Sequence, residues 1–107
     1  MLYRMDSLEL SLNEAAQHYE AKQGGQVIAF IEYRDASSAR LLTHTEVNPD
    51  LEGQGIGSQL VKFALEEIKS SGSSLVPMCP FVAAYVQRHR SEYAALVTPA
   101  HRALYGL

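Results

Sequence analysis

The sequence predicts an α/β fold, and three observations support this prediction. Runs typical of strands, with alternating apolar and polar residues or many β-branched and aromatic residues, fill the first half of the chain. A glycine-rich segment at 52–57 precedes residues 58–69, whose apolar positions have helical spacing. A short apolar strand and a second helical stretch follow. The expected order is β-(β)-β-β-loop-α-β-α-α, in which the bracketed strand is the doubtful one.

The expected strands begin within residues 8–12, where leucine alternates with polar residues. Residues 13–22 fit either a helix or an edge strand, and the sequence leaves both open. Gly24-Gly25 predicts a tight turn. A hairpin is favoured there because residues 27–33 are rich in β-branched and aromatic side chains.

A second turn at 35–38 leads into a strand over residues 40–47. Strict alternation places Leu41, Thr43, Thr45 and Val47 on one face, and Leu42, His44 and Glu46 on the other. Two ionisable groups are therefore expected side by side just before the glycine-rich segment.

Three helical stretches are expected after that segment. The first carries one apolar stripe, formed by Leu60, Val61, Ala64, Leu65 and Ile68, and ends at Gly72. After a short strand at 73–77, Pro80 opens the second helix, where Val82, Tyr85, Val86 and His89 share a face. Thr98-Pro99 starts a short terminal helix, with Gly106 after its end.

The length and composition of the chain limit the classes of function that it can have. A chain of 107 residues holds one core, so a single domain over 1–107 is expected. Its net charge of −3 argues against sequence-independent binding of nucleic acid. No apolar run is long enough to span a membrane, and residues 1–6 lack the apolar region of a signal peptide. One cysteine excludes an internal disulfide and, with four scattered histidines, gives no zinc-type cluster, so we expect a cytoplasmic protein without a metal.

The glycine-rich segment is the clearest candidate site. Gly53, Gly55 and Gly57 precede an amphipathic helix, and glycine lets a ligand approach the main chain. The free N–H groups and the dipole of the helix start favour an anion such as a diphosphate. A flexible turn before a stable helix is the alternative. The Walker pattern is excluded because no Gly-Lys-Ser/Thr follows, and Ser58 stands where the dinucleotide fingerprint needs its third glycine.

The segment Glu52-Gly53-Gln54-Gly55-Ile56-Gly57 resembles the acyl-CoA loop of the GNAT N-acetyltransferase superfamily. Together with residues 44–47 and 76–82, it is similar to a small GNAT-like family of short proteins. The resemblance covers residues 27–97. It departs from the family at Glu52, where a glutamine or arginine is usual, and at His89–Tyr93, where relatives show a His-Pro-x-Tyr-like run.

The resemblance implies a mostly antiparallel, twisted sheet that splays at a cleft for acetyl-CoA, with helices packed on it. One wall would be the strand carrying Glu46 and Val47, whose main chain pairs with the pantetheine arm, and the other the strand ending near Pro77. The cofactor-binding residues would be Glu46, Val47, Gly53, Gln54, Gly55, Ile56, Gly57 and Ser58.

Four residues are candidates for catalysis. Cys79 begins the second helix, where the dipole and free N–H groups stabilise a thiolate, so it is a candidate nucleophile; a buried small hydrophobe is the alternative. His44 and Glu46 are candidate bases that deprotonate an amine; ordinary polar positions on a half-solvated face of the sheet are the alternative. The resemblance implies Tyr85 as general acid, although a core aromatic is the simpler interpretation.

These inferences predict a small acetyl-CoA-dependent N-acetyltransferase with an unidentified amine acceptor, acting as a monomer or a homodimer. The short chain leaves the acceptor side open, which suits an exposed macromolecular acceptor or a pocket completed by a second copy. Two alternatives remain: a non-catalytic acyl-CoA-binding or regulatory module, and a nucleotide-binding domain that uses the same loop.

Overall fold

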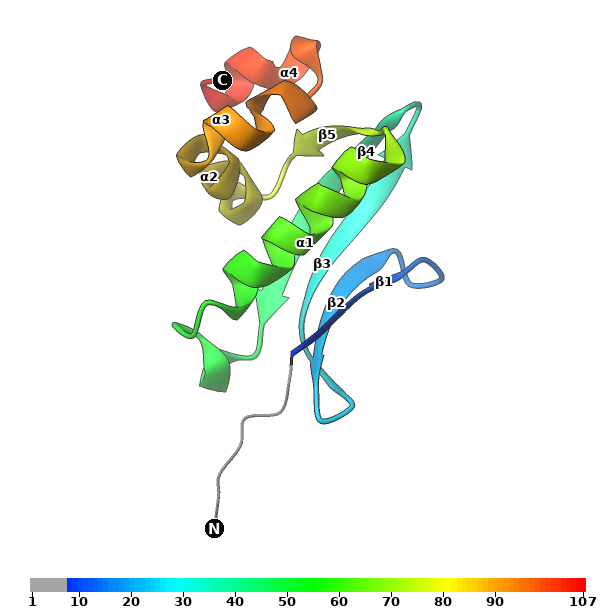
Figure 1. The fold of residues 1–107 in the computed structure, drawn as a ribbon, viewed down its shortest axis with the longest axis vertical. Helices are drawn as coiled ribbons and strands as arrows, with labels where there is room; N and C mark the ends of the chain where they lie inside the picture. The colour runs from blue at the N-terminus through cyan, green and yellow to red at the C-terminus, as the bar shows by residue number, and fades with distance from the viewer. Residues whose placement is uncertain (1–7) are drawn as a thin grey trace.

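The computed structural model describes residues 8–107, so the prediction for residues 1–6 lies outside it. Within this range one five-stranded sheet has the spatial order of the chain (Figure 1). The strands are β1 (Glu9–Asn13), β2 (His18–Gln23), β3 (Gln26–Ala36), β4 (Ala39–Val47) and β5 (Ser74–Pro77). The helices are α1 (Ile56–Ser71), α2 (Pro80–Arg88), α3 (Arg90–Tyr93) and α4 (Pro99–Arg102), with single 3₁₀ turns at Pro49–Leu51, Ala94–Leu96 and Ala103–Tyr105. The predicted α/β fold is confirmed.

The doubtful second strand is present as β2, which pairs antiparallel with both β1 and β3. Two side chains of β2, Tyr19 and Ala21, are fully buried, so burial on one face stabilises a strand where the sequence also allowed a helix. The Gly24-Gly25 turn joins β2 to β3 with φ angles of +60° and +78°, a conformation that glycine adopts without steric cost.

One β-bulge corrects the predicted faces of β4. Glu32 pairs with His44 whereas Tyr33 pairs with Leu42, so Thr43 is an extra residue that reverses the alternation. Leu42 therefore shares the core face with Thr45 and Val47, not the face of His44 and Glu46. For the same reason Leu41 lies across the sheet from Thr45. Strict alternation could not predict this change, because a bulge depends on the partner strand.

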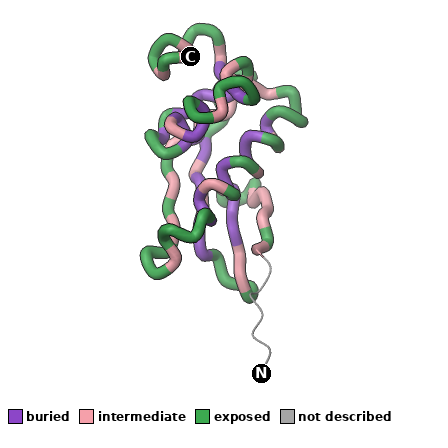
Figure 2. Tube along the Cα trace, turned by 60° about the vertical axis from the view of Figure 1, so that its left-hand side comes forward, coloured by how far each residue is buried: buried purple, intermediate pink, exposed green. Residues whose placement is uncertain are grey.

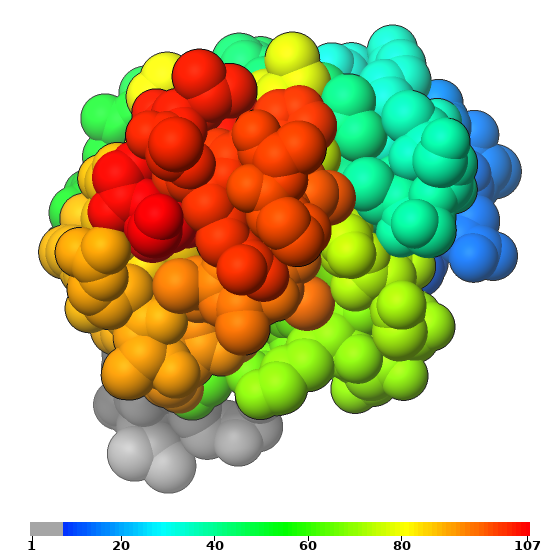
Figure 3. Space-filling model, turned by 90° about the horizontal axis from the view of Figure 1, so that it is seen from above, coloured from blue at the N-terminus to red at the C-terminus, as the bar shows by residue number. Residues whose placement is uncertain are grey.

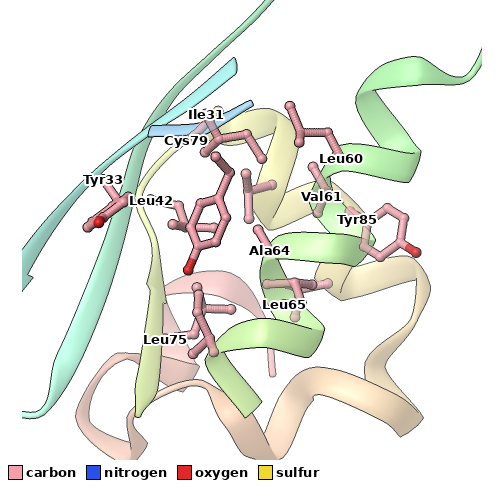
Figure 4. Packing of buried hydrophobic residues seen from close by; sticks show 14 of the residues in the cluster. Ile31, Tyr33, Leu42, Leu60, Val61, Ala64, Leu65, Leu75, Cys79 and Tyr85 are labelled. Carbon is pink, nitrogen blue, oxygen red and sulfur yellow. The ribbon is translucent and has the colours of Figure 1, made fainter. Parts of the chain in front are cut away.

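The core lies between the sheet and α1. The predicted stripe of α1 is confirmed, because Leu60, Val61, Ala64, Leu65 and Ile68 are all fully buried. They pack against the core face of β2–β4 and against α2 (Figure 4). Gly72 ends α1 in the left-handed conformation, as predicted. Buried stretches along the tube lie in the strands, in α1 and in α2, and the turns are exposed (Figure 2).

The short last strand, β5, pairs with only part of β4 and so leaves an opening at the edge of the sheet. β5 pairs in parallel with β4 over four residues, from Ala39↔Ser74 to Leu42↔Pro77. The Cys79 N–H then donates to the Leu42 carbonyl oxygen at 2.8 Å, and the chain turns into α2. No other described strand pairs with β4 on this side, so its second half, residues 43–47, has an open edge.

The C-terminal residues cap one end of the molecule (Figure 3). α2 ends at Arg88, and a separate turn of helix, α3, follows; the sequence did not predict this break. Val97 then forms a parallel bridge with Leu75 of β5. The terminal helix starts after Thr98, and Gly106 follows its last turn in the left-handed conformation, both as predicted.

A polar network ties three strands to α1. Arg40 donates to both carboxylate oxygens of Asp35 at 2.7 and 3.0 Å, and this lowers the pKa of Asp35. Its guanidinium carbon lies 3.9 Å from the ring centroid of Tyr33, a cation–π contact. Arg40 also donates to the hydroxyl of Tyr19 at 3.0 Å, and that hydroxyl donates to Glu67 of α1.

Two buried tyrosines predict a loss of stability at alkaline pH. Burial and a hydrogen bond to a carboxylate, Glu67 and Glu66 respectively, raise the pKa of Tyr19 and Tyr93 above the ordinary value. Above about pH 10 unfolded tyrosines release their protons while these two keep them, so the free energy of unfolding falls as pH rises. Urea unfolding measured from about pH 8 to about pH 11 should show this fall. In Tyr93→Phe the free energy of unfolding should fall less steeply with pH, because one of the two tyrosines is gone. Equal slopes in the two proteins would contradict the assignment.

Candidate functional site

A cavity of about 470 Å³ lies at the open edge of β4. It is bordered by the end of β4, the glycine loop, the first turn of α1 and the start of α2. Its lining residues are Thr45, Val47, Leu51, Glu52, Gly53, Gly55, Ile56, Gly57, Ser58 and Phe81. Most predicted cofactor-binding residues therefore lie around one cavity, whereas Gln54 and Glu46 are not part of its lining.

The glycine loop supplies main-chain donors. Gly53 and Gly55 have φ angles of +85° and +79°, which a side chain would strain. Gly55 is the N-cap of α1 and gives no side-chain hydrogen bond, so the first N–H groups of the helix remain free for a ligand. Glu52 also lines the cavity and adds a negative charge to it. Anion binding here would therefore depend on main-chain N–H groups and the helix dipole.

The main chain of β4 gives a second set of free groups. Asn48 N–H donates to the Ile28 carbonyl at 2.8 Å, so alternate β4 residues, Glu46 included, turn their main chain toward β3. The main-chain groups of Thr45 and Val47 consequently face the open edge. By this register the main chain of Glu46 faces β3, and that of Thr45 lies beside Val47 at the open edge. The role of Glu46 and Val47 in binding a cofactor stays a prediction.

Gly57 lies where α1 comes into close contact with the Phe81 side chain of α2. A Cβ atom built on it would lie 3.0 Å from Cζ of Phe81 and 3.4 Å from Cγ2 of Val47. Phe81 is 42% exposed and forms one wall of the cavity. The absence of a side chain at Gly57 thus lets the Phe81 ring lie against α1.

Cys79 lies behind the cavity wall. The residue is 5% exposed, and its Sγ is 3.3 Å from Oγ1 of Thr45, which does line the cavity. Cys79 is the N-cap of α2 and Pro80 its first residue, as the sequence predicted. The thiol is thus buried in contact with a lining residue and is not itself part of the lining.

His44 and Glu46 lie together on the face of β4 that points away from α1. His44 Nε2 is 2.9 Å from Glu46 Oε2, and both side chains are more than half exposed. The sequence correctly predicted that they are neighbours. They lie beside the open edge, on the opposite side of the sheet from the Thr45 and Val47 side chains.

Tyr85 is placed farther from the cavity. Its ring stacks on His89 with centroids 4.2 Å apart, and its hydroxyl points away from Cys79 and Leu42 (Figure 4). Burial is the main cause that raises the pKa of Tyr85, so the hydroxyl stays protonated near neutral pH. Its role as a general acid stays a prediction.

The sequence did not single out three lining residues, Thr45, Leu51 and Phe81. Phe81 gave one usable signal, because it is a large apolar residue outside the stripe of α2. Among residues 8–107, no three His, Cys, Asp or Glu side chains are grouped to hold a metal ion. The described helices are too short or too polar to cross a bilayer.

Comparison with known proteins agrees with this architecture. Residues 18–96 match the family model of GCN5-related N-acetyltransferases. A GCN5-like protein from Staphylococcus aureus is 24% identical with a TM-score of 0.61, and the alignment covers 78% of this chain and 82% of that one. A GNAT family acetyltransferase from Brucella melitensis, solved with acetyl-CoA, is 22% identical with a TM-score of 0.54, over 71% of this chain and 54% of that one.

An IAA acetyltransferase from Bacillus cereus is 35% identical over 54% of this chain and 40% of its own length, with a TM-score of 0.49. The chain thus spans about half or less of the B. cereus and Brucella proteins. No curated protein sequence matches it significantly. The family match includes β2 to α2, and with them the open edge of β4 and the glycine loop. The chain belongs to the GCN5-related N-acetyltransferase family.

Proposed function

We propose that the protein transfers the acetyl group of acetyl-CoA to an amine. One observation carries the proposal: a single cavity brings together the free N–H groups at the start of α1 and the unpaired edge of β4. The first suits a diphosphate and the second an extended amide-containing chain. Coenzyme A contains both chemical groups in one molecule.

The residues present fit such a ligand. The N–H groups of residues 53–58 would hold the diphosphate, and the main chain of Thr45 and Val47 would pair with the pantetheine amides. Phe81 and Leu51 add apolar walls. Glu52 repels a diphosphate, so its carboxylate lowers affinity relative to a neutral side chain at the same position.

In acetyl transfer the amine nitrogen forms a bond to the carbonyl carbon, and the bond from that carbon to sulfur breaks. The amine must lose a proton before or during the attack. His44 suits this step, because it lies beside the open edge and its ring is held by Glu46 at 2.9 Å. Its imidazole takes the amine proton, and the sulfur departs as a thiolate that is then protonated.

Transfer through Cys79 differs from direct transfer in that a thioester bond to the Cys79 sulfur forms as an intermediate. In the second route the Cys79 thiolate takes the acetyl group first and then passes it to the amine. The 5% exposure of Cys79 and its position behind Thr45 favour direct transfer.

Acetyl-CoA binding tests the proposal and the role of Gly57. Calorimetry should give saturable binding to the wild-type protein. In Gly57→Ala the new Cβ displaces the Phe81 ring that lines the cavity, so we expect about tenfold weaker binding with little change in stability. Ser70→Ala, at the exposed far end of α1, is the control and should bind normally. Absence of binding to the wild-type protein would refute the proposal.

The assignment of the base predicts a specific kinetic loss. His44→Gln should lower kcat by about a hundredfold or more while acetyl-CoA affinity stays unchanged, since the ring lies outside the cavity. The acidic limb of the pH–rate profile should change with it. A variant with the wild-type profile would remove His44 from the mechanism.

Cys79→Ser separates the two routes. Direct transfer predicts turnover within a few fold of wild type, and mass spectrometry after incubation with acetyl-CoA should find no acetyl adduct on Cys79. An adduct that forms and decays at the rate of turnover, together with an inactive Cys79→Ser, would establish the covalent route. Binding without transfer to any amine would instead support the non-catalytic acyl-CoA-binding module.

A further inference from the structure

The face of the sheet opposite α1 carries an ordered arrangement of acids and rings. Cross-strand pairing places one residue from each of β2, β3 and β4 in line, in two adjacent rows. The first row is Glu20, Phe30 and Glu46; the second is His18, Glu32 and His44. Acids and rings therefore alternate along both rows and between them.

The rings of this face are in contact. His18 stacks on Phe30 with centroids 4.4 Å apart and planes 11° apart. Phe30 meets His44 edge to face at 6.2 Å. A large aromatic side chain thus lies half-buried at the middle of the face, with an imidazole on each side.

The acids keep unused capacity for hydrogen bonds. Glu20 is the one buried charged residue within the described part of the chain; it accepts from Asn13 at 3.1 Å, and His18 lies 3.7 Å away. Glu32 accepts from the hydroxyl of Thr43 and is 4.0 Å from Arg34. A buried carboxylate normally accepts several hydrogen bonds, so this face favours the approach of a cation.

The arrangement adjoins the cleft. Glu46 and His44 lie on β4. One edge of this part of β4 pairs with β3, and the opposite edge is the open one. A second hollow of about 240 Å³ is lined by Phe30 and Glu46 together with Asn48 and other residues from the same ends of β3 and β4. A ligand on this face would therefore bring one end to His44 while its other end extends across β3 toward β2.

We propose that this face binds the acceptor and that the acceptor is a linear diamine or polyamine. This inference rests on the proposed function. Neighbouring strands are separated by about 4.8 Å, so the main chains at Glu46 and Glu20, two strands apart, are about 10 Å apart. An amine that reacts near His44 and Glu46 can place a second ammonium group at Glu20. The Phe30 ring lies beneath the connecting chain and contributes apolar and cation–π contact.

Chain length and charge test the proposal. Acetylation by the full chain is measured with octamethylenediamine, with octylamine, which lacks the second ammonium group, and with the shorter putrescine. We expect kcat/KM to be about tenfold higher for octamethylenediamine than for either of the others, the effect of one charge-assisted contact. Equal values for octamethylenediamine and octylamine would overturn the inference and leave the acetyltransferase function intact.

Two variants locate the second ammonium group. Glu20→Gln keeps the shape of the side chain and should remove the preference for octamethylenediamine over octylamine. Phe30→Leu should weaken both long amines and spare acetyl-CoA binding. Glu14→Gln removes a charge from the exposed β1–β2 turn and is the matched control, which should retain the preference.

The outcomes separate the two proposals. Saturable acetyl-CoA binding with no transfer to any amine would refute the acetyltransferase proposal itself. Transfer to a lysine-containing peptide in preference to all three amines would overturn the polyamine assignment and indicate a macromolecular acceptor. A preference for octamethylenediamine that survives Glu20→Gln would exclude Glu20 as its cause and overturn the proposed arrangement.

Discussion

The end of pairing between β4 and β5 is the constraint on which the rest of this molecule depends. The two strands share a ladder as far as Leu42 and Pro77, and the hydrogen bond from Cys79 to Leu42 fixes the point of divergence. Proline lacks the N–H that would continue the ladder, and α2 begins three residues later. Because β5 leaves the sheet there, the outward-facing main-chain groups of Thr45 and Val47 stay unpaired beside the start of α1.

The bulge at Thr43 lies at the same point and gives β4 its two different faces. It turns Leu42, Thr45 and Val47 toward α1, while His44 and Glu46 point to the other side of the sheet. One strand therefore contributes to the core, to the cavity and to an open polar face. The main-chain edge lies between the two faces, so a thioester held along it would be accessible from the side of His44.

Much of this fold could be predicted from the sequence, because its signals are local. The stripe of α1, the Gly24-Gly25 turn, and Pro80 and Gly72 at helix ends each follow from a short segment. The bulge and the break between α2 and α3 could not be predicted, since both depend on tertiary contacts. The glycine loop of the site was predictable for the same local reason, whereas the position of Cys79 behind Thr45 depends on two segments far apart in the chain.

The face of the sheet opposite α1 sets the conditions under which the proposed acceptor would bind. Among the described helices, α1 crosses β1–β4 on the face opposite the rows of acids and rings (Figure 1), where His44 and Glu46 are exposed and Phe30 and Glu32 are half-buried. An open face cannot select a ligand by enclosure, since water competes with each contact. Selectivity must then come from charge and spacing, and the fixed distance between strands provides the spacing. Glu20 fits that role because it is the buried carboxylate of the face, and burial strengthens its interaction with a cation.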